Sequence, residues 1–205
     1  MTASSEAGGG SGGGGAGSSW LRSLAIYGER RVLSMLALGF SAGLPFMLVF
    51  STLSAWLTQS GIKRATIGML AWVGIAYSVK FLWAPVVDRF QLPLLGRLLG
   101  QRRSWMLLAQ CGIALGLLNV SWSDPAQSVL QVAAFSLLVA FSSATQDIAI
   151  DAWRIEVAPV EQQALMAGVT TLGYRLGLLV GGAGALFLAT RPSWGGAYLW
   201  MAAIM

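Results

Sequence analysis

The sequence predicts an all-α, polytopic transmembrane helical bundle, and three observations lead to this prediction. First, 56% of the residues are hydrophobic and only 10% are charged, against about 25% charged in a soluble domain. Second, the apolar residues gather in runs long enough to cross a bilayer, which takes about 20 residues. Third, the basic residues gather in the short segments between these runs, the usual arrangement in membrane proteins. The composition supplies too little polar surface for a soluble globule of this size.

Five complete apolar runs and the start of a sixth follow one another along the chain. We expect crossing helices at about Val32–Leu57, Ala65–Val87, Ser104–Trp122, Ser128–Ile150 and Ala164–Ala189. The sixth run begins near Trp194 and stops at Met205. It reaches only about 18 Å as a helix, short of the roughly 30 Å hydrocarbon core. We therefore expect the chain to end inside a sixth helix, and we interpret it as a fragment or a truncated reading frame.

Glycines at four-residue spacing in three of the runs predict close helix–helix packing, because they let two backbones approach each other in lipid. They are Gly39 and Gly43 in the first run, Gly112 and Gly116 in the third, and Gly173, Gly177 and Gly181 in the fifth. We expect them to pack helices within one bundle rather than to form a dimer seam. Pro45 lacks a backbone N–H, so it should bend or break the first helix.

The distribution of lysine and arginine predicts the orientation in the membrane. Basic residues are most numerous before the first run and between the second and third, with fewer on the opposite side. The first group is Arg22, Arg30, Arg31, Arg89, Arg97, Arg102 and Arg103, and the opposite group is Lys63, Arg64 and Arg191. The N-terminus and the segment between the second and third runs are therefore expected in the cytoplasm.

Residues 1–19 differ from the rest of the chain. Gly8–Ser19 is almost entirely Gly, Ser and Ala, which bury no apolar surface, so we expect a flexible tail and a helix bundle over residues 20–205.

The composition excludes several kinds of function. The net charge of +5 comes from basic residues between the apolar runs, as in membrane proteins, and does not indicate nucleic-acid binding. The chain has no histidine, which excludes a histidine proton relay and imidazole metal sites. The single cysteine, Cys111, excludes an internal disulfide.

Arg175 lies near the middle of the fifth apolar run. A charge at mid-depth costs several kcal/mol unless it faces protein or a water-filled cavity. Each residue of a helix turns by about 100°, so Arg175 points away from the glycine stripe of the same run, and we expect it to face a cavity. Its guanidinium suits carboxylates. We weigh two roles for Arg175 equally, contact with a substrate and an ion pair between helices. Charged groups inside several membrane spans together form a polar pathway, which indicates a transporter.

The fourth run ends with Asp147, Asp151 and Arg154 at positions i, i+4 and i+7, which places them on one helix face. Asp151 and Arg154 are close enough to pair. Asp147 lies deeper, where a carboxylate can take up and release a proton, and this suits proton coupling. The alternative, which we favour, is a charged helix end neutralised by Arg154 or Lys80. Lys80 either pairs with Asp147 or extends to the membrane interface.

Tyr77 and Trp83 flank Lys80 at three-residue spacing, so they are expected to share its face. They could stack on a sugar ring, although aromatic anchoring at the membrane interface is the commoner role.

The segment after the second run carries an acidic residue followed by dispersed basic residues. It reads Asp88-Arg89, then Gly96-Arg97, then Arg102-Arg103. This pattern resembles the signature loop of the major facilitator superfamily, which acts as a conformational latch. A Leu-Leu-Gly insert, Leu98–Gly100, spreads the residues wider than in the usual pattern.

Four longer strings resemble the AmpG-type muropeptide permeases, which are bacterial inner-membrane members of that superfamily. They are Leu38–Pro45, Phe81–Arg89, Ser143–Ala152 and Leu172–Gly177, in this order. The resemblance covers the chain from about residue 30 and implies proton-driven import of anhydromuropeptides for peptidoglycan recycling. The family has two helical halves, so the resemblance also implies that a C-terminal half is missing and that this chain does not transport alone.

Substrates of this class carry sugar hydroxyls and peptide carboxylates. We expect Arg175 and Lys80 to attract the carboxylates, Gln146 and Tyr77 to hydrogen-bond or stack, and Asp147 or Asp151 to carry the proton, with no cofactor beyond the proton gradient. Two alternatives stay open: a permease for another substrate, such as acetyl-CoA or a small peptide, and a membrane scaffold that does not transport. An enzyme is not expected, because no nucleophile–base pair, metal-ligand cluster or phosphate loop stands out.

Overall fold

The computed structural model describes residues 30–191 and 193–205. The chain divides into two units, residues 1–34 and 35–205. In the first, the described residues form the opening turn of a helix, where the Ser34 hydroxyl donates to the Arg30 carbonyl at 2.7 Å. The predicted flexible tail, residues 1–19, lies outside the described residues. Within the described residues every regular element is a helix, as the composition predicted.

Five helical segments of the described chain are long and apolar enough to cross a membrane: Arg30–Gln59, Arg64–Leu82, Gln101–Trp122, Val129–Val157 and Val160–Ala189. They coincide with the five predicted runs. The largest difference is at the end of the fourth, which the sequence predicted near Ile150 and which continues to Val157. Asp151 and Arg154 are therefore helical residues rather than the flank of a helix. The predicted start of a sixth span is α12 (Trp194–Ile204).

The first segment is built from α2 (Arg30–Met47), the π-helical turn η1 (Leu48–Thr52) and α3 (Leu53–Gln59). The helix continues through Pro45, where the sequence predicted a bend or a break. Irregularity comes three residues later, in the π-turn. The Thr52 hydroxyl there donates to the Gly181 carbonyl at 2.7 Å, so this turn contacts a second π-helical turn, η5 (Val180–Gly184).

The second segment is the least regular. It runs through α4 (Arg64–Leu70), the 3-10 turn η2 (Ala71–Gly74), α5 (Ile75–Ser78) and the 3-10 turn η3 (Lys80–Leu82), before α6 (Ala84–Arg89). Gly61 precedes it with a φ of +75°. Its N–H reaches the Thr58 carbonyl, and the N–H of Ile62 reaches that of Leu57, the pattern of a glycine-terminated helix end.

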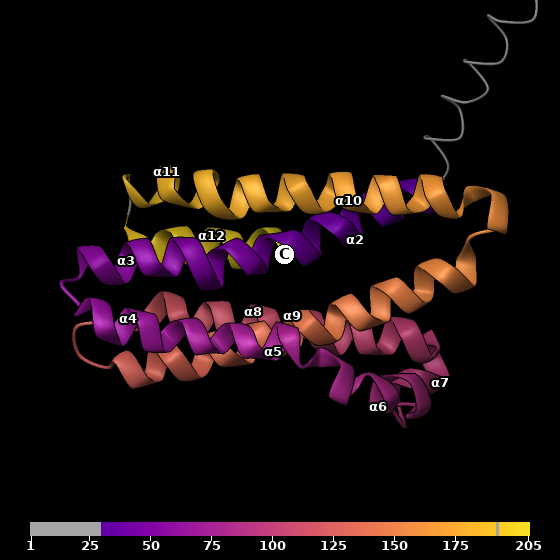
Figure 1. The fold of residues 1–205 in the computed structure, drawn as a ribbon, viewed down its shortest axis with the longest axis horizontal. Helices are drawn as coiled ribbons and strands as arrows, with labels where there is room; N and C mark the ends of the chain where they lie inside the picture. Colours follow the sequence, from indigo (N-terminus) through magenta and orange to yellow (C-terminus); the bar gives the residue numbers. More distant parts are fainter. Residues whose placement is uncertain (1–29, 192) are drawn as a thin grey trace, which may run out of the picture. The chain divides into compact units, whose positions relative to one another are not determined.

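The third and fourth segments are α8 (Gln101–Trp122) and α9 (Val129–Val157), which lie side by side in Figure 1. A Cβ on Gly112 would meet the Ser142 side chain, and one on Gly116 would meet Val139. These glycines therefore set the spacing between α8 and α9, as their periodicity predicted. The short α7 (Leu95–Leu99) connects α6 to α8.

The fifth segment consists of a 3-10 turn, α10 (Gln163–Leu179), η5 and α11 (Ala185–Ala189). Its glycine stripe packs on α2, since a Cβ on Gly173 or Gly177 would overlap the carbonyl of Leu36 or Phe40. A Cβ on Gly43 would in turn overlap the Tyr174 carbonyl. The stripes therefore pack two helices of one bundle, as expected.

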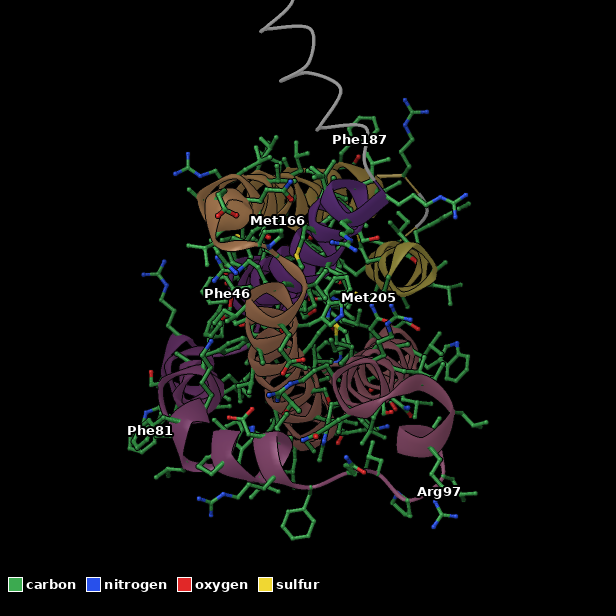
Figure 2. The ribbon with its side chains drawn as sticks, turned by 90° about the vertical axis from the view of Figure 1, so that its right-hand side faces the viewer. Phe46, Phe81, Arg97, Met166, Phe187 and Met205 are labelled. Carbon is green, nitrogen blue, oxygen red and sulfur yellow. The ribbon has the colours of Figure 1, made fainter. Side chains whose placement is uncertain are left out.

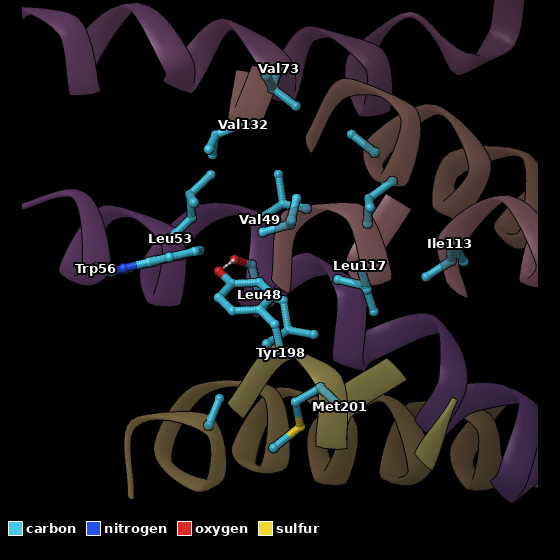
Figure 3. Close-up of a cluster of buried hydrophobic side chains, with 14 of the residues drawn as sticks. Leu48, Val49, Leu53, Trp56, Val73, Ile113, Leu117, Val132, Tyr198 and Met201 are labelled. Carbon is cyan, nitrogen blue, oxygen red and sulfur yellow. Dashed lines mark hydrogen bonds between the residues drawn. The ribbon is translucent and has the colours of Figure 1, made fainter. Parts of the chain in front are cut away.

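A buried apolar cluster joins all five segments and α12 (Figure 3). Leu48, Ile113 and Leu117 are fully buried within it. The hydroxyl of Tyr198 donates to the Leu48 carbonyl at 2.8 Å, a bond drawn in Figure 3. The Leu48 carbonyl begins the π-turn and also accepts from the backbone N–H of Leu53, so the Tyr198 hydroxyl adds a second bond that ties α12 to this turn.

Candidate functional site

A pocket of about 210 Å³ lies among four of the segments and collects polar side chains inside otherwise apolar spans. It is lined by Ala42 of α2, Lys80 of η3, Asp147, Ile150 and Asp151 of α9, and Thr170, Thr171 and Tyr174 of α10. Three predicted site residues, Lys80, Asp147 and Asp151, therefore come together. Polar groups gathered within membrane spans mark a functional site by default.

Lys80 and Asp147 form an ion pair across this pocket, with 3.6 Å between Nζ and Oδ2. Their side chains are 37% and 20% exposed, so the pair opens to the pocket rather than lying sealed in the core. The local fold explains the contact: α5 ends at Ser78, and Lys80 starts a 3-10 turn next to α9. Of the two roles weighed for Lys80, the structure has the pairing with Asp147.

One turn further along α9, Asp151 lines the same pocket. Its Oδ1 lies 3.4 Å from Nη2 of Arg154, which confirms the pair that the helix spacing predicted. Asp151 is exposed, whereas Asp147 is only partly accessible. The two carboxylates thus share one helix face but differ in partner and accessibility, a distinction that the sequence did not provide.

Whether Tyr77 and Trp83 share the face of Lys80 stays a prediction. The α-helix ends at Ser78 and a 3-10 turn begins at Lys80, and both Lys80 and Trp83 reach α9. Trp83 packs on the Phe141 ring at 4.7 Å, and its Nε1 donates to the Thr145 hydroxyl at 3.2 Å.

Tyr77 instead lies against Phe46 and Phe50, with ring centroids 5.4 and 5.9 Å away. Phe46 points into the bundle in Figure 2, whereas Phe81 lies on its outside. Tyr77 is therefore a half-buried packing residue in this conformation and does not line the pocket. Its predicted contact with substrate stays a prediction.

Gln146 is fully buried between α9 and α2, and it does not line the pocket. Its Nε2 donates to the Ser41 hydroxyl at 2.6 Å. Its Oε1 finds no partner among the described residues, and neither do the buried hydroxyls of Tyr77 and Ser143. A substrate contact by Gln146 would require the neighbouring helices to separate, so this too stays a prediction.

Arg175 is exposed and is not among the residues that line the polar pocket, so the expectation that it faces a cavity stays a prediction. Gly173 and Gly177 pack on α2, and Arg175 lies one turn after Thr171, which lines the pocket. Leu172 and Leu176 are exposed on either side of it. Among residues 30–191 and 193–205, Arg175 makes no ion pair, which also leaves the alternative of internal helix pairing without support. Its role as a substrate contact stays a prediction.

The predicted latch residues lie in three helices, the short α6 and α7 and the start of the long α8, rather than in one loop. Asp88 and Arg89 end α6, Gly96 and Arg97 lie in α7, and Arg102 and Arg103 begin α8. Arg97 is exposed at the outside of the bundle (Figure 2).

Arg102 is the centre of a charged cluster at this end of the bundle. Its Nη1 lies 2.5 Å from Asp88 Oδ1, and its Nε lies 2.8 Å from Glu156 Oε1 near the end of α9. One guanidinium thereby connects α6, α8 and α9. The Arg103 guanidinium lies 6.0 Å from the centroid of the Trp153 ring. This cation–π contact joins α8 to α9 beside the Arg102–Glu156 ion pair.

Sequence reasoning missed Thr170, Thr171 and Tyr174 in the pocket and Glu156 in the cluster. Thr171 lies one turn before Arg175, so a search for polar residues on that helix would have found it. Glu156 was missed because α9 was expected to end near Ile150. Among the described residues, no group of three or more His, Cys, Asp or Glu side chains is placed to hold a metal ion.

Comparison with known proteins gives a consistent family. Residues 32–133 match the family described as acetyl-coenzyme A transporter 1. The chain is 41% identical over 183 residues to the anhydromuropeptide permease of Escherichia coli K12, covering 89% of this chain and 36% of that protein. It is 39% identical over 176 residues to "Putative transporter AmpG 4" of Rickettsia conorii, covering 85% and 42%.

A third relative, "Putative transporter AmpG 3" of Rickettsia prowazekii, is 32% identical over 174 residues, covering 84% of this chain and 41% of that protein. The chain thus spans well under half the length of these relatives. Their names, the match over most of this chain and five helices able to cross a membrane agree with the four strings quoted above. The chain is a multi-pass membrane protein and belongs to the AmpG-type permease family of the major facilitator superfamily.

Proposed function

We propose that this chain forms one helical bundle of a proton-coupled importer of anhydromuropeptides, with the Lys80–Asp147 pocket as its polar centre. The observation that carries the proposal is this ion pair, held at 3.6 Å inside two membrane spans and open to a pocket. The substrate class comes from the name of the Escherichia coli relative. A carboxylate on such a substrate is a ligand for the Lys80 ammonium.

The pair suggests how proton and substrate are coupled. While Asp147 is charged, it occupies Lys80. A proton on Asp147 removes that attraction, so that Lys80 becomes available to a substrate carboxylate; release of the proton restores the pair and displaces the substrate. Asp151 is the less suitable proton carrier, because it is exposed and paired with Arg154. Energy comes from the proton gradient, without an organic or metal cofactor.

Transport by rocking of two bundles about a central site requires a second bundle opposite this pocket. The relatives are long enough to contain one, since this chain covers only 36% of the Escherichia coli protein. The second bundle, or the substrate between the bundles, would meet the exposed Arg175. Residues 1–205 alone, reconstituted into liposomes, should then give no concentrative uptake, and such uptake would refute the two-bundle proposal.

The proposed location is the bacterial inner membrane, with the N-terminus and the Arg102 cluster in the cytoplasm. Lys and Arg are concentrated at that end of the spans. Cys111 is the single cysteine of these 205 residues, so residues 1–205 with Cys111→Ser permit accessibility mapping with one new cysteine at a time. A cysteine at Arg97 should react with a membrane-impermeant maleimide only after the cells are opened.

The direct test of function is uptake of radiolabelled anhydromuropeptide by cells that lack other permeases and express the complete gene product. We expect accumulation that collapses with a protonophore, and recovery of the substrate chemically unchanged, as expected of a transporter rather than an enzyme. Protein in the membrane without uptake of any tested substrate would favour the scaffold alternative.

The match to the acetyl-coenzyme A transporter family supports a second candidate, a nucleotide thioester. The pocket charges disfavour it, because a polyphosphate would meet Asp147 and Asp151 against the single cation Lys80. Competition decides between the two: unlabelled anhydromuropeptide should block uptake of the labelled compound, and acetyl-CoA should not.

A further inference from the structure

Three buried polar atoms gather beside Asp147 but outside the pocket that it lines. They are the hydroxyl oxygens of Tyr77 and Ser143 and the Oε1 atom of Gln146, and each is buried without a hydrogen-bond partner in residues 30–191 and 193–205. Burying a polar group without a partner is costly, and folded proteins rarely do so. The residues that line the pocket include none of these three.

The geometry of α9 brings two of these atoms to Asp147. Ser143 lies four residues before Asp147 and three before Gln146, so its side chain neighbours both of them on the helix surface. The Gln146 amide is held from the other side, since its Nε2 donates to the Ser41 hydroxyl at 2.6 Å, and that hydroxyl in turn donates to the Leu38 carbonyl at 3.1 Å. The free atom of the amide is therefore an acceptor.

Tyr77 brings the third atom from the second segment. Its helix, α5, packs on α9, and the Tyr77 hydroxyl lies beside the Ser143 hydroxyl and close enough to Asp147 to feel its charge. The two hydroxyls do not meet in a geometry that satisfies either of them. The Tyr77 ring packs against Phe46 and Phe50, so apolar side chains surround its polar tip.

Together the three atoms match the bonding needs of one water molecule. A buried water makes about three hydrogen bonds, to polar groups that otherwise have no partner. The Oε1 atom of Gln146 only accepts, whereas the hydroxyls of Tyr77 and Ser143 either donate or accept. One water can therefore donate to Gln146 and bond both hydroxyls, which satisfies all three groups at once.

The three atoms lie on the far side of Asp147 from the Arg102 cluster. Asp151, which lines the pocket, is one turn from Asp147 toward that end of α9, and Ser143 is one turn from Asp147 in the opposite direction. With the Arg102 cluster in the cytoplasm, as proposed above, Ser143 lies on the outer side of Asp147. Protons driven inward by the gradient arrive from that side.

We propose that Tyr77, Ser143 and Gln146 bind a water molecule that delivers the proton to Asp147. Asp147 is the proton carrier of the proposed function, on which this inference rests. A proton that reaches the bound water passes to a carboxylate oxygen of Asp147: one O–H bond of the hydronium breaks, one O–H bond forms on the carboxyl group, and a neutral water remains. The three polar side chains hold the water and do not themselves change charge.

X-ray radiolysis tests whether this water is bound. Hydroxyl radicals formed from a bound water label the side chain next to it, even inside a protein, and mass spectrometry locates the label. The complete gene product in detergent is exposed for milliseconds. We expect Tyr77 to be labelled several-fold faster than Tyr198, the matched control, which is a buried tyrosine whose hydroxyl already donates to the Leu48 carbonyl at 2.8 Å.

Two neighbouring serines separate a bound water from bulk solvent that reaches the half-buried Tyr77 ring. Ser143→Ala removes one partner of the water and should lower the labelling of Tyr77 several-fold. Ser142→Ala should leave it unchanged, because Ser142 is also buried but faces α8, where a Cβ on Gly112 would meet its hydroxyl.

Transport in vesicles tests the delivery of the proton. Ser143→Ala should lower the rate of proton-driven uptake several-fold relative to the rate of substrate exchange without a gradient, and Ser142→Ala should keep the ratio of the two rates. A loss of folded protein or of substrate affinity would lower both rates together, so the ratio reports proton delivery alone.

Two results would overturn the inference. Labelling of Tyr77 that is no faster than that of Tyr198, or that is equal in the two serine variants, would exclude the bound water. Labelling that falls in Ser143→Ala while the ratio of rates stays unchanged would show a water that does not deliver the proton. Failure of the proposed function would look different, because Asp147→Asn would then keep proton-driven accumulation whatever the labelling of Tyr77.

Discussion

The ammonium of Lys80 lies 3.6 Å from the carboxylate of Asp147, and the two residues belong to different membrane spans. The contact depends on a local irregularity, because Lys80 follows the end of α5 and begins a 3-10 turn. The pair links the second segment to the middle of α9 at the edge of a pocket. Four predictions follow from this site and from the packing that positions it.

Asp147→Asn should abolish proton-driven accumulation of substrate, because the amide is nearly the same size but cannot carry the charge that pairs with Lys80. Exchange of labelled for unlabelled substrate without a gradient should continue. Both are measured in vesicles made from cells that express the complete gene product. Asp151→Asn is the matched control and should keep most of the accumulation. If the two variants behaved in the opposite way, Asp151 would be the proton carrier.

Arg175→Ala should reduce uptake strongly while leaving the amount of protein in the membrane unchanged. The reason is that Arg175 is exposed and forms no ion pair with the described residues, so its loss removes no contact that holds this bundle together. Uptake and immunoblots of membranes provide the two measurements, and Leu176→Ala tests the effect of truncating an exposed neighbour. Loss of the protein from the membrane would instead indicate that Arg175 pairs helices.

Gly177→Ala should destabilise the bundle by about 1–3 kcal/mol, the usual cost of overpacking. The added Cβ would overlap the backbone carbonyl of Phe40 on α2, which cannot move without moving its helix. Thermal unfolding in detergent should show the loss. Gly168→Ala on the same helix is the control, since a Cβ there meets nothing within 4 Å. Equal unfolding temperatures for the two variants would contradict the close packing of α10 on α2.

Arg102→Ala should slow transport more than it lowers stability. Arg102 bonds both Asp88 and Glu156, but these carboxylates are 48% and 53% exposed, so their ion pairs contribute only about 1 kcal/mol or less. The cluster should matter chiefly for holding α6, α8 and α9 together during a conformational change. Initial uptake rates and unfolding temperatures test this directly.

Arg97→Ala is the matched control for the Arg102 variant. Arg97 belongs to the same predicted latch, but it is exposed and forms no ion pair with the described residues. Its removal should leave the uptake rate close to that of the unchanged protein. Equal effects of the two substitutions would mean that the general positive charge of this segment, rather than the Arg102 cluster, controls transport.

The periodic features of the chain were predictable from the sequence because they depend on local geometry. Apolar runs of bilayer length located the five spans, and four-residue glycine spacing identified the faces of α2, α8 and α10 that pack closely on other helices. The Asp151–Arg154 pair followed in the same way, since residues three apart on a helix are neighbours. Each inference needed only the regular rise and turn of one helix.

The neighbours of each side chain could not be predicted in this way. Tyr77 lies against Phe46, whereas Lys80 and Trp83 both reach α9, at Asp147 and Phe141. These contacts depend on how the second segment packs on the helices beside it.

By itself, the sequence determined that this chain crosses a membrane, the approximate positions of its five spans and the glycine faces that approach other helices closely, because these follow from composition and a period of 3.6 residues. The tertiary structure decided which charges meet. It brought Lys80 to Asp147, joined Arg102 to Glu156, buried Gln146 and left Arg175 exposed. These pairings depend on the rotation of each helix against its neighbours, which is set by packing between residues far apart in the chain.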